Sequence, residues 1–316
     1  MITRRTVQRM FLLRPDSEIN AIFEYCLAEA AARFEIGIVG WLAMSNHYHA
    51  IVFDPGAKLP AFLEHFHKMV AKAVNGHHER WENLWSTEET CVTRLVTLDD
   101  VFDKLVYTLA NPAAAHLVDH VAHWPGSSSW TRMGKGPKPV KRPAVYFKKN
   151  GVMPETVELR VIPPPGLKGE SYECWIARVR QAVELREAEA AQSRRSKRIK
   201  LVGRKKVLET DPFAAPSTDT PRRRLRPALA CKDGERMSEE RAILCGFRQG
   251  YRTMFEAYVT QNRKESALAK AKSAGKSAKR QRATRKTPIE FPAGTYRFRI
   301  LGLRCAPFPA AAAAAV

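Results

Sequence analysis

The chain has 316 residues, and its 53 lysines and arginines outnumber its 32 aspartates and glutamates to give a net charge of +21. Such a surplus favours a polyanionic partner, of which nucleic acid is the commonest in a cell. The six cysteines contain no C-x-x-C pair, which argues against a zinc ribbon or a disulfide scaffold and favours a reducing compartment. Because no run of about 18 apolar residues occurs, we expect no membrane partner and a cytoplasmic, nucleoid-associated location.

Residues 1–150 have the pattern of a globular domain in which strands and helices alternate. Ser45 and Asn46 separate two apolar runs and predict a tight turn, so the flanking strands should form a hairpin. Apolar residues spaced i, i+3, i+4 predict the helices, and Asp16 or Ser17 is suited to cap the first of them. The expected elements are a strand at 6–13, a helix at 15–34, strands at 38–44 and 47–53, a helix at 59–78, a strand at 90–97 and a helix at 98–110. This order predicts an α+β fold, with a ferredoxin-like (split βαβ) antiparallel sheet and one extra helix.

The character of the sequence changes after residue 150. "VIPPPG" is typical of a linker, while residues 171–191 and 237–262 have helical patterns. "RRSKRIKLVGRKK" has eight basic residues among 13, "PRRRLRP" repeats the theme, and the chain ends in the low-complexity "PFPAAAAAAV". We therefore expect two regions, a domain at 1–150 and a basic extension at 151–316 that is partly helical and partly disordered.

Two histidine pairs of the form H-x-H differ in their expected setting. His47 and His49 lie in "MSNHYHAIVF", which reads as a strand, so both imidazoles should point to the same face of the sheet. His65 and His67 lie in a helical pattern, where residues i and i+2 diverge by about 200°. Only the strand pair can therefore approach one metal ion, although a strand pair can also simply hydrogen-bond at a sheet edge.

Further candidate ligands lie in "YTLANP", at the end of the helix predicted at 98–110. Tyr107 and Asn111 are four residues apart, a spacing that places them on one helix face. If this face packs near the histidines, two imidazoles and an amide oxygen could hold Mn²⁺, or Mg²⁺ where a phosphate helps. Each residue also has a simpler interpretation: Tyr107 as a core aromatic, and Asn111 as a helix stop before Pro112.

Taken together, these motifs resemble the REP-associated tyrosine transposases, HUH-type enzymes that act on single-stranded DNA with one catalytic tyrosine. The family pattern is approximately M-x-N-H-x-H-L-L and later Y-I-x-x-N-P-x-x-A-x-L-V, and this chain has "MSNHYHAIV" and "YTLANPAAAHLV". "NLWSTEET" is similar to the family's LW segment, and "WPGSSSW" to its W-S-S element. The resemblance covers about residues 1–135. "AAAH" stands where the family often has V-R-A-G, which leaves the DNA specificity open.

The resemblance implies that Tyr107 is the nucleophile and that His47, His49 and Asn111 hold Mg²⁺ or Mn²⁺. It implies cleavage and rejoining of single-stranded DNA, near a hairpin or repeat, through a 5′-phosphotyrosine and a free 3′-hydroxyl. Lys104, one turn before Tyr107, could help to ionise the phenol. A homodimer is one candidate assembly.

Other residues are expected to contact the DNA backbone or its bases. The candidates are Arg4, Arg5, Lys104, Trp85, Arg194, Arg195, Lys197 and Arg198. Tyr48 should face away from the histidines and pack against a helix.

Three other functions stay open. A domesticated relative would bind hairpin DNA without cutting it, and a relaxase or replication initiator would share the metal motif. An RNA-binding ferredoxin-like module would need exposed aromatics in a pattern such as K-G-F-G-F, which is absent from the sequence.

Overall fold

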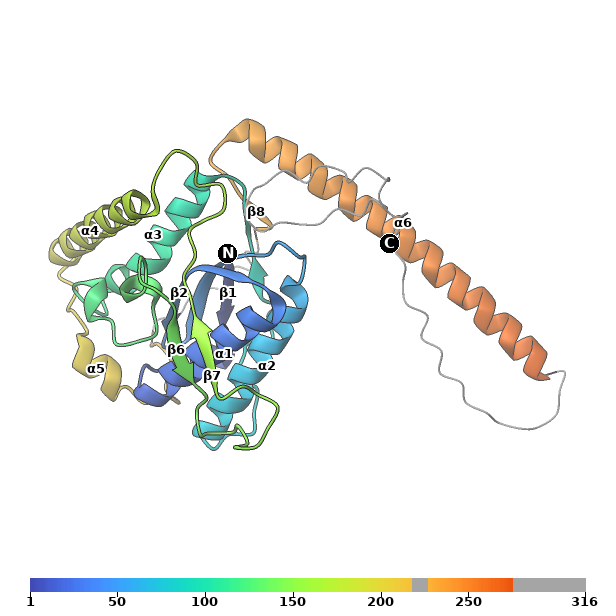
Figure 1. The fold of residues 1–316 in the computed structure, drawn as a ribbon, viewed down its shortest axis with the longest axis horizontal. Helices are drawn as coiled ribbons and strands as arrows, with labels where there is room; N and C mark the ends of the chain where they lie inside the picture. Colours follow the sequence, from blue (N-terminus) through green and yellow to red (C-terminus); the bar gives the residue numbers. More distant parts are fainter. Residues whose placement is uncertain (218–226, 275–316) are drawn as a thin grey trace. The chain divides into compact units, whose positions relative to one another are not determined.

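The computed structural model describes residues 1–217 and 227–274 (Figure 1). These residues form two compact units, one comprising the described residues up to 232 and one that starts at residue 233. The first unit is a mixed α/β structure around a four-stranded antiparallel sheet. The strands of this sheet are β1 (Ile2–Arg5), β2 (Gly37–Met44), β3 (His47–Phe53) and β4 (Cys91–Val92), in the spatial order β2-β3-β1-β4.

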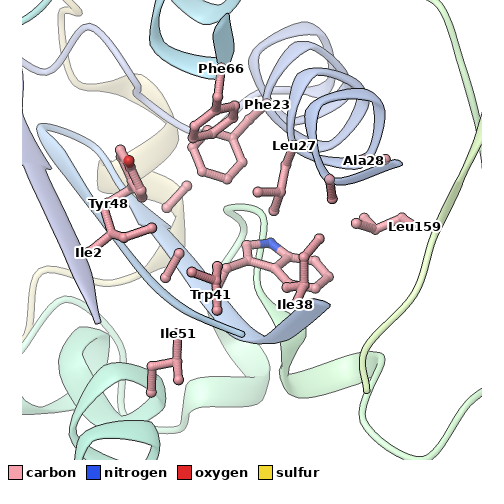
Figure 2. Packing of buried hydrophobic residues seen from close by; sticks show 14 of the residues in the cluster. Ile2, Phe23, Leu27, Ala28, Ile38, Trp41, Tyr48, Ile51, Phe66 and Leu159 are labelled. Atoms are coloured by element: carbon pink, nitrogen blue, oxygen red, sulfur yellow. The ribbon is translucent and has the colours of Figure 1, made fainter. Parts of the chain in front are cut away.

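Helices α1 (Ser17–Phe34) and α2 (Leu59–His77) cover one face of this sheet. The core between them is aromatic: the rings of Phe23, Tyr48 and Phe66 meet edge to face, with centroids 5.5–5.6 Å apart (Figure 2). Tyr48 is fully buried, as the alternation of the strand predicts. The Asp16 carboxylate caps α1 by accepting a hydrogen bond from the Ile19 amide, so that cap prediction is confirmed.

Helix α3 (Leu98–Ala114) packs against β2 and β3 on the opposite face of the sheet. Its start is fixed by a capping box, in which the side chains of Thr97 and Asp100 accept each other's backbone amide. The helix runs past Pro112, four residues beyond the predicted end at 110, and the Ala115 amide still donates to the Asn111 carbonyl. Asn111 therefore lies inside the helix, one turn after Tyr107.

Two predicted strands differ from the structure. The first strand ends at Arg5 and does not occupy 6–13, because Arg5 pairs with His47, the first residue of β3, and the next residue, Thr6, forms only an isolated bridge to Trp85. Residues Val7–Arg9 form a 3₁₀ turn instead, with Gln8 and Arg9 at positive φ. The strand predicted at 90–97 is divided into β4 and β5 (Arg94–Leu95), because the second half leaves the sheet to pair with a later segment.

Residues 115–232 complete the first unit. Two 3₁₀ turns (Val121–His123 and Ser129–Thr131) precede a hairpin of β6 (Lys138–Lys141) and β7 (Thr156–Leu159) that packs against α1. Helix α4 (Tyr172–Ser196) lies beside α3, and α5 (Arg204–Glu209) follows it. Strand β8 (Leu229–Ala230) pairs in parallel with β5. The region from 151 to 232, as far as it is described, thus belongs to the same compact unit as the sheet.

The second unit contains one long helix, α6 (Gly234–Ala274), which includes the helical pattern predicted at 237–262. Most of "PRRRLRP" and all of "PFPAAAAAAV" lie outside the described residues. None of the helices in the two described ranges combines the length and the apolar character needed to cross a membrane.

A buried polar network joins the sheet to α2 on the aromatic face. The Arg4 guanidinium donates to His67 Nδ1 at 2.6 Å, so the ring proton lies on Nε2, which donates to the Tyr48 hydroxyl at 2.5 Å. The Trp85 indole donates to the His67 carbonyl at 2.9 Å. Burial and the nearby Arg4 charge hold the pKa of His67 well below its ordinary value of 6.5.

This network predicts how stability responds to acid. Since folded His67 resists protonation, the unfolded chain binds more protons below pH 6.5, and the free energy of unfolding falls there as the pH falls. In His67→Gln, an amide can still accept from Arg4 and donate to Tyr48 without titrating. Below pH 6.5, the unfolding free energy of the parent should fall by about 1.4 kcal/mol more per pH unit than that of His67→Gln. Urea denaturation between about pH 5 and pH 8 measures this slope.

His120→Gln is the matched comparison, because Glu187 raises the pKa of His120 by a hydrogen bond. That substitution should lower the free energy of unfolding by a constant amount below pH 6.5, so the slope there is unchanged, and it should change the slope only above pH 6.5, where the contribution of protonated His120 is lost as the pH rises. Equal slopes below pH 6.5 for the parent and His67→Gln would contradict the buried, neutral state of His67.

Candidate functional site

The alternation of β3 places His47 and His49 together on the face of the sheet that α3 covers. Their ring centroids lie 4.9 Å apart and their planes are inclined by 83°. His49 is buried, whereas His47 is half-buried at the start of the strand. The strand geometry therefore brings the two imidazoles side by side, as the sequence predicts.

The proton of His47 can be assigned from its neighbours. Asn46 Nδ2 donates to the Arg9 carbonyl at 3.2 Å, which orients the amide so that its Oδ1 faces His47 Nδ1 at 2.7 Å. Oδ1 can only accept, so Nδ1 carries the ring proton. The lone pair of His47 then lies on Nε2, which this network leaves available for a ligand.

His49 is held in a similar way from the neighbouring strand. Thr3 stands opposite His49 in the β1–β3 register, and its hydroxyl lies 2.8 Å from His49 Nδ1. His49 Nε2 points the other way, and the Asn111 side-chain nitrogen lies 3.3 Å from it. Both histidines thus use Nδ1 to contact the protein, the arrangement that orients imidazole ligands in metal sites.

Helix α3 brings the phenol to the same place. The Tyr107 ring centroid lies 5.7 Å from that of His49, and 53% of the Tyr107 side chain is exposed. The Lys104 ammonium lies 5.9 Å from the Tyr107 ring centroid, one turn earlier on the helix. His47, His49, Tyr107 and Asn111 therefore form one cluster in which the phenol faces solvent.

The electrostatic setting keeps both imidazoles neutral. Burial, together with the positive charge of Arg5, lowers the pKa of His49 to about 4. Burial, His49 and Arg5 hold the pKa of His47 well below 6.5. Arg5 is exposed and pairs with His47 across β1 and β3. The cluster thus combines neutral nitrogen donors with an exposed cation at its edge.

This donor set fits a divalent ion. Two imidazole Nε2 atoms and an amide form a mixed nitrogen and oxygen set, once the Asn111 amide rotates to present its oxygen. Among the residues that the structure describes, no group of three or more His, Cys, Asp or Glu side chains is placed to hold a metal ion. His65 and His67 diverge as predicted, with His65 bound to Glu29 on α1.

Several residues that the sequence predicts to contact DNA lie outside the cluster of His47, His49, Tyr107 and Asn111. Arg4 and Trp85 belong to the His67 network on the opposite face of the sheet, where Trp85 is 6% exposed. Residues Arg195, Lys197 and Arg198 are exposed at the end of α4, and Arg194 is half-buried there. The charges of Arg194 and Lys197 add to burial in lowering the pKa of His116, which follows the end of α3. The basic segment therefore lies near the end of the helix that carries Asn111.

Thr3 and Asn46 are site residues that the sequence reading did not single out as such. Asn46 could have been identified from its position, because it immediately precedes the first histidine and ends the hairpin turn. Thr3 gives no local signal, since only the pairing of β1 with β3 brings it to His49.

Comparisons with known proteins find a weak structural likeness and no match in sequence. No family model and no curated protein matches the chain. The chain is similar to the solved structure of a REP-associated tyrosine transposase bound to a REP hairpin, with a TM-score of 0.35 and 19% identity over 42% of this chain and 76% of that one. Since a likeness at this level does not define the family, the site is interpreted from its own geometry.

The opposite settings of Tyr107 and Tyr48 predict a difference in chemical reactivity. Tetranitromethane modifies accessible phenols, so Tyr107 (53% exposed) should be nitrated rapidly and Tyr48 (0% exposed) should be protected in the folded chain. Peptide mapping by mass spectrometry measures both rates. Tyr146, which is 45% exposed, serves as the accessible control. Nitration of Tyr48 at the rate of Tyr107 would contradict the two-faced arrangement of β3.

Proposed function

We propose that this protein cuts and rejoins single-stranded DNA through a 5′-phosphotyrosine at Tyr107, with Mg²⁺ or Mn²⁺ held by His47, His49 and Asn111. The observation that carries the proposal is the convergence of these four side chains from β3 and α3, with Tyr107 exposed at the edge of the cluster. A solvent-facing phenol beside two oriented, neutral imidazoles has no evident structural purpose.

Two further observations support the proposal. The motifs "MSNHYHAIV" and "YTLANP" supply the four residues in the order of the transposase pattern that they resemble. The strand order β2-β3-β1-β4, with α1 and α2 as the two connections on one face, supports the ferredoxin-like arrangement that we propose for the sheet. The fourth strand of that arrangement is reduced to two residues, and α3 is the additional helix.

The chemical step transfers a phosphoryl group from the DNA to the phenol. Tyr107 Oη attacks the scissile phosphorus and loses its proton to solvent, while the bond to the 3′-oxygen breaks and that oxygen takes up a proton. The products are a 5′-phosphotyrosine and a free 3′-hydroxyl. A divalent ion in this site would polarise the phosphate and offset the charge that develops on its oxygens.

Rejoining is the reverse of this step with a different 3′-hydroxyl. The incoming hydroxyl attacks the phosphotyrosine phosphorus, the bond to Tyr107 breaks, and the phenol regains a proton. The number of phosphoester bonds is unchanged, so no nucleotide cofactor is required. The roles of Lys104 and Arg5 are electrostatic: both are cationic groups next to the position that the phosphate would occupy.

A non-cutting hairpin-binding protein is the main alternative. It would share the basic surface and the fold, but it would not need an exposed phenol with a lysine beside it. Covalent capture of DNA separates the two functions directly.

Tyr107→Phe should abolish the covalent protein–DNA adduct and retain DNA binding, because the substitution removes only the nucleophilic oxygen from an exposed position. The adduct is measured by denaturing gel electrophoresis after incubating the full chain with Mg²⁺ or Mn²⁺ and a labelled single-stranded hairpin oligonucleotide. Tyr146→Phe is the matched control, since its exposed phenol lies outside the cluster. An adduct that persists in Tyr107→Phe would refute the assigned nucleophile.

Asn46→Ala should weaken Mn²⁺ binding about 10- to 100-fold, because it removes the acceptor that orients His47 through Nδ1. Mn²⁺ affinity is measured by the electron paramagnetic resonance signal of the free ion, in the absence of DNA. His49→Ala should remove a ligand outright, and His65→Ala should have no effect because His65 bonds to Glu29 instead. Mn²⁺ affinity that is equal in the parent, Asn46→Ala and His49→Ala would refute the metal site.

A further inference from the structure

A groove of about 480 Å³ lies between the exposed side of α1, the segment 121–131 and strand β6. The four residues of the candidate site do not line it. Ser128 forms a bridge to Leu42 of β2, and Leu42 is in register with His49 on β3. Because adjacent strands lie about 4.8 Å apart, this wall of the groove is roughly 10 Å, or two strand spacings, from His49.

The walls of the groove are held by internal hydrogen bonds. The Asn20 amide donates to the Pro125 carbonyl at 2.8 Å and accepts from the Ser127 amide at 2.9 Å. The Trp41 indole donates to the Ser127 hydroxyl at 2.8 Å from inside the core. The loop that forms one wall is thus anchored to both α1 and the sheet, so the groove is preformed and a ligand need not order it.

The groove has a net positive charge. Its acidic residue, Glu24, is neutralised by the Lys138 ammonium at 2.7 Å and also accepts from the Ser127 hydroxyl at 3.1 Å. Lys141 lines the groove as well and is exposed at the end of β6. Charge therefore favours an anionic group next to Lys141.

An aromatic surface accompanies this charge. Trp130 lines the groove and is only partly buried, and the guanidinium of Arg180 from α4 lies 5.3 Å from its ring centroid. Indole rings stack on nucleobases, and a neighbouring arginine adds a cation–π contribution. The volume of about 480 Å³ falls in the range of small-ligand pockets, which suits one nucleotide.

We propose that this groove binds one unpaired nucleotide of the DNA strand, with the base stacked on Trp130 and the phosphate next to Lys141. That the bound strand is DNA rests on the proposed function, whereas the existence and lining of the groove are observed in the structure. Asn20 and Glu24 are already hydrogen-bonded within the protein, so binding depends on stacking and charge and shows little preference among bases. The groove would thereby hold the strand at a second point beyond the β2 edge.

The test uses the full chain carrying Tyr107→Phe, which separates strand binding from cleavage. Its affinity for a fluorescein-labelled oligothymidylate of about 12 nucleotides is measured by fluorescence anisotropy. Adding Trp130→Ala should weaken binding about 5- to 100-fold, whereas Trp130→Phe should retain most of the affinity because a ring remains. Trp81→Ala is the matched control, since Trp81 is 98% exposed and does not line the groove.

Lys141→Glu tests the groove independently of Trp130, because a substitution at this exposed position should not prevent folding. This variant should also weaken binding. Lys168→Glu, exposed and outside the groove, is its control. A photocross-link from an iodouracil-substituted oligonucleotide should map to the peptide containing Trp130. Unchanged affinity in Lys141→Glu and in folded Trp130→Ala, with no cross-link to that peptide, would overturn the proposal. Adduct formation by the parent chain, which tests Tyr107, is unaffected by that outcome.

Discussion

The alternation of side chains along β3 is the constraint on which the rest of this structure depends. Tyr48 is buried among Phe23 and Phe66, which fixes the register of the strand and thereby turns His47 and His49 to the other face. A slip of one residue would bury the two imidazoles in an aromatic core and expose Tyr48. The hydrophobic energy that stabilises one face of the sheet therefore also positions the polar cluster on the opposite face.

The two faces show how environment distinguishes residues of one type. His67 is surrounded by partners, with a hydrogen bond at each ring nitrogen and Trp85 on its carbonyl, so it serves the fold. His47 and His49 are both held through Nδ1, by Asn46 and Thr3, and the Asn111 amide, the proposed third ligand, lies 3.3 Å from His49 Nε2. A histidine whose second nitrogen is left available next to reactive groups is suited to ligand binding, because its orientation is fixed without using its lone pair.

The region after residue 115 contributes more than charge to the first unit. Helix α4 lies beside α3 and brings the basic segment that starts at Arg194 close to His116, while the 121–131 segment and β6 form a groove along α1. Both features flank the sheet that carries the polar cluster. The proposed nucleophile, the basic helix end and the groove thus lie within one compact unit, which is the arrangement expected if a single strand contacts several of them.

The sequence by itself determined what depends on local periodicity. The shared face of His47 and His49, the divergence of His65 and His67, the cap of α1 and the pairing of Tyr107 with Asn111 all follow from the spacing of residues along one element. Only the tertiary structure decided which elements meet. Arg4 and Trp85 lie on the face opposite the cluster, the first strand ends at Arg5, and the strand predicted at 90–97 divides to pair with β8. These outcomes depend on the register between distant segments, and the repeat of a single strand or helix contains no information about its partner.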